Sequence, residues 1–184
     1  KAKLDALLKE TPDNTQALTT LANILIDEGK NDDAIALAKQ TLSVDEKSTQ
    51  AFTLLGHAYI GKKDPASALP YFEKAFEIQP KITRSRLDLA VCLVDLKQYD
   101  RAEAELKEVI REAPKFPLAQ FNLGVMYEEQ GRLEEARAAY AEEVKNHPYE
   151  FKARFNLGKL LFKLGDRQGY LAEMREVIKR APDQ

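Results

Sequence analysis

The chain has 184 residues, of which 44% are hydrophobic and 32% are charged, with only 8 Gly and 8 Pro. This balance suits helices that carry narrow apolar stripes. Acidic and basic residues nearly cancel at a formal net charge of -2, so no broad electrostatic field draws the chain to nucleic acid or to a membrane surface, and we expect neither as a partner.

The single Cys92 excludes an intramolecular disulfide. No apolar run approaches the roughly 20 residues that a membrane helix requires, so we expect a soluble protein. Whether it is cytoplasmic or periplasmic stays open. The chain begins K-A-K-L, without an initiator Met or a secretory leader, which predicts an excerpt from a longer protein or a processed product.

An internal repeat of 34 residues organises the chain. When the sequence is written in rows of 34 from Thr15, one column contains only leucine and the next contains only Ala or Gly. The leucines are Leu21, Leu55, Leu89, Leu123 and Leu157, and the small residues are Ala22, Gly56, Ala90, Gly124 and Gly158. Prolines near the row ends share one register, at Pro12, Pro80, Pro114, Pro148 and Pro182.

Each row predicts two amphipathic helices, because its apolar residues return every three or four positions on either side of a short polar break. One such pair cannot bury its apolar face alone, so the pairs should stack into an all-α, right-handed superhelical solenoid with the first helices on the concave side. In chain order the units are a lone second helix in 1–14, then the rows 15–48, 49–82, 83–116, 117–150 and 151–184.

Residues in the breaks indicate where helices end and begin. Gly29, Gly131 and Gly165 can adopt the left-handed conformation that ends a first helix. Asp64 followed by Pro65 supplies an N-cap and a preorganised first turn for a second helix. These signals place the break at the same point of each row.

Three residues depart from the pattern. Pro70 falls inside a second helix, where it removes one hydrogen bond, so we expect it on the outer surface. Glu143 stands in a column that is otherwise small or apolar. Tyr170 replaces the expected Ala, and we expect the last helix to tilt away from its partner, with Gly158 leaving room for part of the ring.

The columns resemble the tetratricopeptide repeat. In the second row, L-G-H-A-Y (55–59) is followed by Ala68, Phe72, Ala75 and Pro80, and in the fourth row L-G-V-M-Y (123–127) begins the same pattern. The resemblance covers five rows and implies an α-helical module that binds proteins, with no cofactor and no catalysis of its own. The last row (154–165, R-F-N-L-G-K-L-L-F-K-L-G) faintly resembles such segments appended to larger bacterial enzymes.

The residues themselves give no catalytic or metal site. His57 and His147 are the only histidines, and neither has a Cys or carboxylate arrangement suited to a metal or a nucleophile. Cys92 lies in an inward column, where we expect an inert buried thiol. We therefore predict a chain that is not an enzyme and carries no metal.

The predicted binding surface is the concave groove, which the second, fifth, sixth, ninth, twelfth and thirteenth residues of each row should face. These positions are mostly polar in the early rows and apolar or aromatic in the late rows. The residues expected to contact a partner are Asn23, His57, Arg84, Phe121, Asn122, Val125, Lys152, Phe155, Asn156, Lys159 and Lys163.

Two binding modes of similar repeats can be compared with these positions. A clamp for a C-terminal carboxylate needs five Lys, Asn or Arg residues over three rows, and each window of this chain matches only two, which disfavours it. A ladder of Asn that pairs with an extended peptide backbone is represented by Asn122 and Asn156. The lysines of the last row favour an acidic segment or a free carboxylate. Alternatively, Asn is common in this column for packing or solubility.

The sequence thus predicts a protein-interaction module that holds an extended peptide in its groove. The alternative is a structural segment that docks or oligomerises a larger, possibly enzymatic protein. We also expect self-association through uncapped ends, because the apolar edge of the last helix, around Leu171, Met174 and Ile178, needs a cover.

Overall fold

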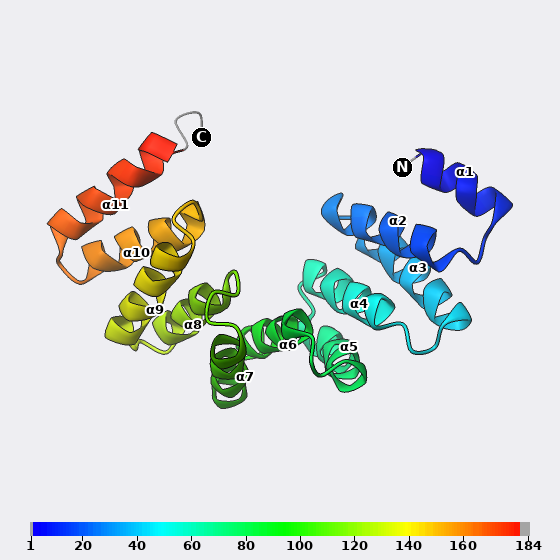
Figure 1. The fold of residues 1–184 in the computed structure, drawn as a ribbon, viewed down its shortest axis with the longest axis horizontal. Helices are drawn as coiled ribbons and strands as arrows, with labels where there is room; N and C mark the ends of the chain where they lie inside the picture. Colours follow the sequence, from blue (N-terminus) through cyan, green and yellow to red (C-terminus); the bar gives the residue numbers. More distant parts are fainter. Residues whose placement is uncertain (1, 181–184) are drawn as a thin grey trace. The chain divides into compact units, whose positions relative to one another are not determined.

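The structure is a computed structural model that describes residues 2–180. Lys1 and residues 181–184, including Pro182, lie outside the described residues. The described residues form eleven helices and no strand, and they fall into two compact units, one up to Ala102 and one from Glu103 onward. Each unit is a stack of helix pairs, so the fold is an all-α solenoid (Figure 1).

In the first unit the helices pack in the order of a repeat stack. Helix α2 contacts the second helix of its own row, α3, and the next first helix, α4, and α4 likewise contacts α5 and α6. The elements are α1 (Ala2–Glu10), α2 (Thr15–Asp27), α3 (Asn31–Val44), α4 (Thr49–Gly61), α5 (Pro65–Ile78) and α6 (Thr83–Asp95), and α7 (Tyr99–Glu112) begins in this unit and ends in the second.

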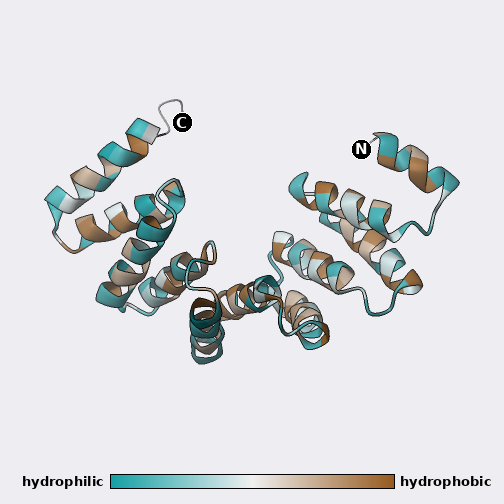
Figure 2. Ribbon diagram, in the orientation of Figure 1, coloured by the Kyte–Doolittle hydropathy of each residue, from teal (hydrophilic) through white to brown (hydrophobic). Residues whose placement is uncertain are grey.

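The second unit continues the alternation of first and second helices. Here α9 contacts both α8 and α10, and α10 contacts α11. The elements are α8 (Ala119–Glu129), α9 (Leu133–Asn146), α10 (Phe151–Lys163) and α11 (Arg167–Arg180). Apolar and polar residues alternate along these helices with the helical period (Figure 2), which gives each helix one face to bury.

The core of each unit is made where the apolar stripes of neighbouring helices meet. In the first unit, Leu21 and Leu25 of α2 pack with Ile35 of α3 and with Leu54 and Leu55 of α4 in one buried cluster. A single helix pair exposes one side of this cluster, and the next pair covers it. The rows therefore stabilise one another in sequence.

The glycines of the small column receive large side chains. A Cβ placed on Gly56 would lie 2.5 Å from the Phe72 ring, and one on Gly124 would lie 2.6 Å from the Tyr140 ring. Each glycine and its ring are 16 residues apart, on the two helices of one row. The glycines of this column therefore act as sockets for a specific side chain of the second helix.

In the last row this socket is filled by methionine. The nearest atom to a Cβ on Gly158 would be Met174 Cε, whereas the Tyr170 ring would lie at 3.7 Å. The Tyr170 ring packs instead on Phe162, with centroids 5.3 Å apart. Gly158 thus makes room mainly for Met174, which corrects the role we expected for it.

The predicted helix ends are confirmed by the backbone. Gly29, Gly131 and Gly165 have positive φ angles of 74°, 74° and 88°. Lys63 and Lys97 occupy the same column in the second and third rows and adopt the same conformation, with φ of 59° and 58°. A left-handed residue is therefore required at this point of every row, whether or not it is glycine.

The second helix α5 begins as predicted. The Asp64 side chain accepts a hydrogen bond from the Ser67 backbone N–H at 3.1 Å, and Pro65 occupies the first turn. Pro70 lies inside α5 and is exposed, as expected.

Helix α8 begins later in its row than the other first helices. Those helices start at the first residue of their rows, but α8 starts at Ala119, the third, after Leu118 with a φ of 67°. Leu118 therefore forms the N-cap position, not the first turn of a helix. The backbone N–H groups at this helix start bind the carboxylate of Glu143 on α9. Its Oε1 accepts the Leu118 N–H at 2.9 Å, and its Oε2 accepts the Phe121 N–H at 3.2 Å.

Candidate protein-interaction face

The residues predicted to bind a partner lie in both units, and in the first unit the structure joins two of them. Arg84 Nε donates a hydrogen bond to Asp88 Oδ1 at 2.9 Å, and His57 Nε2 lies 3.4 Å from the same oxygen. Asp88 is buried, with 8% of its side chain exposed, and the His57 ring packs on Phe72 at 5.3 Å. Asn23 is exposed on α2. An internal carboxylate thus already engages the Arg84 and His57 side chains.

In the second unit, three predicted residues lie on α8 and are half-buried. The Phe121 ring packs at a tilt on Tyr140, with centroids 5.8 Å apart. Asn122 Nδ2 donates to the Leu118 carbonyl at 2.8 Å, inside its own helix. Val125 lies one helical turn from Phe121. Part of this surface therefore supports the helix pair itself.

Tyr140 links the helices beneath this surface. Its hydroxyl donates to Glu128 Oε2 of α8 at 3.0 Å. Burial and then the Glu128 carboxylate raise the pKa of Tyr140, and the side-chain amide of Asn156 on α10 opposes this rise. The sequence analysis did not select Tyr140, although its position 16 residues after Gly124 could have marked it. Tyr140 therefore supports this surface from below, and Asn122 uses one amide N–H within its own helix.

The predicted residues of α10 other than the half-buried Asn156 are exposed, together with Phe162, which the register places in the groove, and Phe151, which it does not. Phe155 is 43% exposed, and Phe151 and Phe162 are 44% and 58% exposed. At about 100° per residue, the three phenylalanines lie within about 40° of one another around the helix. Lys152, Lys159 and Lys163 form a second stripe beside them. We call these six residues the α10 face.

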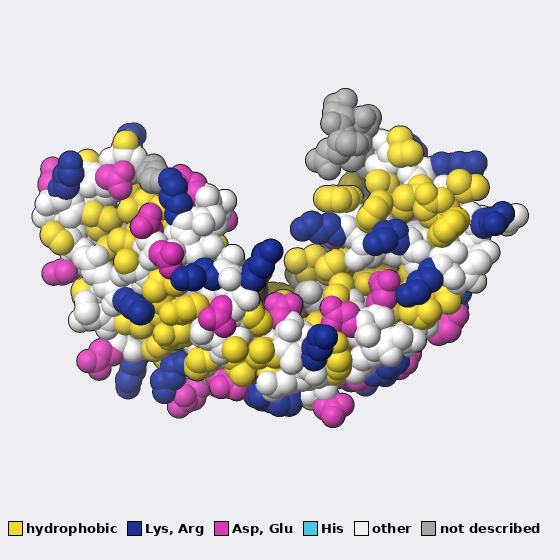
Figure 3. Space-filling view, turned by 180° about the vertical axis from the view of Figure 1, so that it is seen from behind, with side chains coloured by type: hydrophobic (Ala, Val, Ile, Leu, Met, Phe, Trp, Pro, Cys, Tyr) yellow, Lys and Arg dark blue, Asp and Glu magenta, His cyan; other side chains and the backbone are white. Residues whose placement is uncertain are grey.

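Lys159 and Phe155 show how the two stripes meet. The Lys159 ammonium lies 5.8 Å from the Phe155 ring centroid, within the range of a cation–π contact. On the side shown in Figure 3, acidic and basic side chains are interspersed. The α10 face therefore stands out by its exposed aromatic rings next to basic groups, an arrangement that marks interaction surfaces.

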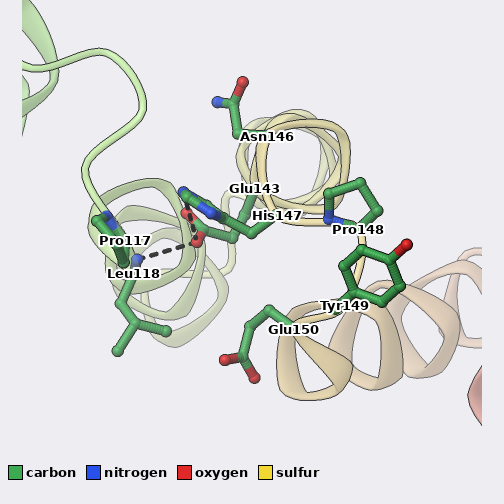
Figure 4. Close-up of a pocket in the computed structure, with 8 residues that line it drawn as sticks. All are labelled: Pro117, Leu118, Glu143, Asn146, His147, Pro148, Tyr149 and Glu150. Atoms are coloured by element: carbon green, nitrogen blue, oxygen red, sulfur yellow. Dashed lines mark hydrogen bonds and ion pairs between the residues drawn. The ribbon is translucent and has the colours of Figure 1, made fainter. Parts of the chain in front are cut away.

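A separate pocket of about 400 Å³ lies where α8, α9 and α10 approach one another (Figure 4). Its Glu143 side chain is buried, with only 1% exposed, and His147 Nε2 lies 3.8 Å from Glu143 Oε1 and 3.1 Å from the Lys115 carbonyl. The lining residues are Pro117, Leu118, Glu143, Asn146, His147, Pro148, Tyr149 and Glu150.

The described residues contain no group of three or more His, Cys, Asp or Glu side chains placed to hold a metal ion. Cys92 is buried, with Sγ 3.4 Å from the Pro65 carbonyl, and burial raises the pKa of its thiol to about 11. The thiolate is therefore scarce at neutral pH, in agreement with the predicted inert thiol. Among the described helices, none has the length and apolar character needed to cross a membrane.

Models of known protein families match this chain along its repeats. Two models described as tetratricopeptide repeat match residues 87–151 and 152–183, and the model of anaphase-promoting complex, cyclosome, subunit 3 matches residues 27–109. The chain belongs to the tetratricopeptide repeat family. No curated protein matches this tetratricopeptide repeat chain in sequence.

Solved structures share its fold. PilW, a type IV pilus biogenesis factor, is 24% identical with a TM-score of 0.86, over 100% of this chain and 85% of PilW. TTC0263, a thermophilic TPR protein of Thermus thermophilus, is 25% identical with a TM-score of 0.76, over 86% of this chain and 87% of TTC0263. YrrB, described as a TPR protein with an unusual peptide-binding site, is 23% identical with a TM-score of 0.65, over 98% of this chain and 93% of YrrB.

Proposed function

We propose that this tetratricopeptide repeat chain is a non-catalytic protein-interaction module, whose α10 face, with Phe121 and Asn122 of α8, binds an extended, partly acidic segment of a partner. The observation that carries the proposal is the pair of stripes on α10. Three exposed phenylalanines lie beside three exposed lysines on one side of a single helix. The peptide-binding site named for YrrB supports the class of ligand.

The two stripes contribute differently to binding. Removing a Phe side chain from water is worth about 1.5–3 kcal/mol, so the rings would provide most of the affinity. Exposed ion pairs are worth about 0–1 kcal/mol each, so the lysines would mainly orient an acidic segment and speed its association. The expected ligand therefore alternates acidic and apolar residues.

The two asparagines are placed to hold the backbone of such a segment. Asn122 donates an amide N–H to the Leu118 carbonyl, which fixes the orientation of its amide. Asn156 is half-buried on α10. The side-chain carbonyl oxygens of both residues would serve as acceptors for backbone N–H groups of the ligand. Replacing both by Ala should lower affinity by about 1–3 kcal/mol without unfolding the chain.

The α10 face can be tested with a short peptide that alternates Glu and Leu, titrated into isotope-labelled protein and followed by amide chemical shifts. We expect shifts along α10, and weaker binding to the double variant Phe155→Ala/Phe162→Ala. Val44→Ala, which removes an exposed apolar side chain of α3, is the matched control. Equal binding of a peptide that alternates Lys and Leu, or unchanged binding of the double variant, would exclude the proposal.

A second candidate role, as a structural or oligomerisation segment of a larger protein, is favoured by α11. Leu171 and Ile178 are 49% and 68% exposed there. If a second copy covers this surface, sedimentation should show concentration-dependent dimers that Ile178→Asp abolishes. A chain that stays monomeric at high concentration would contradict self-association.

A further inference from the structure

One edge of the second unit, formed by α10 and α11, carries apolar side chains that the other described helices of this unit leave uncovered. Phe162 of α10 is 58% exposed, and Leu171 and Ile178 of α11 are 49% and 68% exposed. Within the second unit, no described helix occupies the place beyond α10 and α11 that α4 occupies beyond α2 and α3 (Figure 1). We call these three residues the α11 edge.

The same positions of the first row show what such an edge binds. Four rows earlier in the register, the residues that correspond to Phe162, Leu171 and Ile178 are Ile26, Ile35 and Leu42. Ile35 is only 8% exposed and lies in one buried cluster with Leu54 and Leu55 of α4. Ile26 and Leu42 pack against that cluster. In the first row, these positions therefore contribute to a core that a following helix completes.

A helix covers the first row because α4 presents its apolar residues on one side. Leu54, Leu55 and Ala58 all belong to the buried cluster, and their spacing places them on one face of a helix. An extended segment would turn alternate side chains to opposite faces and would leave backbone N–H groups unpaired against an apolar surface. The α11 edge therefore fits an amphipathic helix better than an extended chain.

Basic side chains surround the apolar residues of this edge. The exposed charged side chains described on α11 are Arg167, Arg175 and Lys179. At about 100° per residue, the two arginines lie within about 40° of Leu171 around the helix. Glu173 of α11 is half-buried and pairs with an arginine of α10 at 2.6 Å. A helix with carboxylates beside its apolar stripe would therefore be complementary in charge.

A second copy of this chain is a poorer occupant than another protein. Two α11 edges placed face to face would oppose their basic side chains, which is unfavourable. The helix α1 of a second copy carries two basic and two acidic residues, so it offers no net charge to the edge. Its Leu4 and Leu8 already pack against the core of the first unit. The charge and the packing both favour a different protein.

We propose that the α11 edge binds an acidic amphipathic helix of a partner protein, which stacks on α10 and α11 as α4 stacks on α2 and α3. The helix places its apolar stripe over Phe162, Leu171 and Ile178 and its carboxylates near Arg167 and Arg175. The α10 face shares only Phe162 with this edge. The proposal is therefore independent of the extended segment proposed for the α10 face.

The test uses the full isotope-labelled chain and three synthetic peptides of about 18 residues, because shorter helices are marginal in water. All three carry Leu, Leu and Ala with the spacing that α4 shows. The first has glutamates on both sides of this stripe, the second has lysines there, and the third is the first with a central proline. The glutamate peptide should shift the amide signals of the α11 edge and gain helical circular dichroism. The lysine and proline peptides should bind at least fivefold more weakly, and equal binding of either would overturn the proposal.

Variants separate this edge from the α10 face and from self-association. The double variant Leu171→Ala/Ile178→Ala removes exposed side chains and should weaken the glutamate peptide at least fivefold, whereas Phe155→Ala, which changes only the α10 face, should not. Arg175→Glu leaves the apolar residues in place, so it keeps the test decisive if the double variant unfolds, and it should reduce the preference for glutamate over lysine at least threefold. Undiminished binding by these variants, or dimers in sedimentation that exclude the peptide, would contradict the proposal.

Discussion

Glu143 holds the start of α8 through Leu118, whose backbone N–H it binds at 2.9 Å from 25 residues away in the sequence. A second bond, to the Phe121 N–H, makes Glu143 the cap of a helix to which it does not belong. We expect Glu143→Ala to lower the free energy of unfolding by about 2–3 kcal/mol, because two buried N–H groups lose a charged acceptor. Urea denaturation measures the change.

Two variants control this prediction. Glu143→Gln keeps one acceptor oxygen and should cost less than Glu143→Ala. Glu142→Ala removes the neighbouring, 40% exposed side chain, which pairs with Lys145, and should change stability by less than about 0.5 kcal/mol. A loss for Glu143→Ala as small as that for Glu142→Ala would show that the cap does not stabilise the chain.

The socket at Gly56 predicts an unusual response to alanine. In an exposed helix position, Gly→Ala stabilises by about 0.5–1 kcal/mol. At Gly56 the added methyl would lie 2.5 Å from the ring of Phe72, which is only 2% exposed and has no room to move. We expect Gly56→Ala to destabilise by about 1–3 kcal/mol in thermal and urea unfolding.

Phe72→Leu supplies the test of mechanism. In the double variant Gly56→Ala/Phe72→Leu the smaller side chain relieves the overlap. The double variant should therefore lose less unfolding free energy than the sum of the losses of the two single variants. Simple additivity would mean that the two positions do not contact each other as described.

At Lys63 we expect the opposite effect, because replacement by glycine should stabilise the chain. It is exposed and has a φ of 59°, a conformation that costs a side-chain-bearing residue about 1–2 kcal/mol. Allowing for the greater freedom of glycine in the unfolded chain, we expect Lys63→Gly to stabilise by about 0.5–1 kcal/mol. The same change at Lys74, an exposed position inside α5, should destabilise by about 1 kcal/mol. Melting temperatures that move in the same direction for both variants would be inconsistent with this account.

Glu103 makes the second unit sensitive to acid. The hydrogen bond from Arg132, at 2.8 Å, and further bonds from Lys107 and Tyr127 lower the pKa of Glu103 from 4.5 to about 2. Because the pKa is lower in the folded state, this contribution is fully present above about pH 4.5 and is lost as the pH falls toward 2. Its size is about 1–3 kcal/mol, since the side chain is only 18% exposed.

The measurement compares the natural chain with Glu103→Gln in urea at pH 7 and at pH 3. The difference in unfolding free energy between the two proteins should shrink by more than half at pH 3. A difference that stays constant between these pH values would show that the charge of Glu103 does not stabilise the fold.

Much of the fold was readable from sequence because the repeat signals are local. The left-handed glycines 29, 131 and 165 and the cap at Asp64 act within a few residues of the helix ends that they set. The late start of α8 could not be read in this way. The late start depends on Glu143. The sequence shows that Glu143 stands in an otherwise small or apolar column, but it does not show which backbone N–H groups Glu143 binds.

The candidate site was readable only in part. The register predicts that the lysines and Phe155 face the groove, and the structure shows them exposed on α10. It did not indicate that His57 meets Asp88, or that Tyr140 hydrogen-bonds Glu128, because these contacts join side chains of different helices. Sequence periodicity gives the side of a helix, and the partner of each polar group requires the packed structure.

The glycine sockets bear on how such an array can be recombined. Gly56 accepts Phe72 and Gly124 accepts Tyr140, whereas the corresponding positions of the first row carry Ala22 and Ala38. A crossover in the loop between two helices of one row would join Ala22 to Phe72, placing a methyl group where a ring must fit. A crossover between rows keeps each socket with its own ring. Gene duplications and chimaeras of this chain should therefore survive when they exchange whole helix pairs, with their junctions in the loops that precede the first helices.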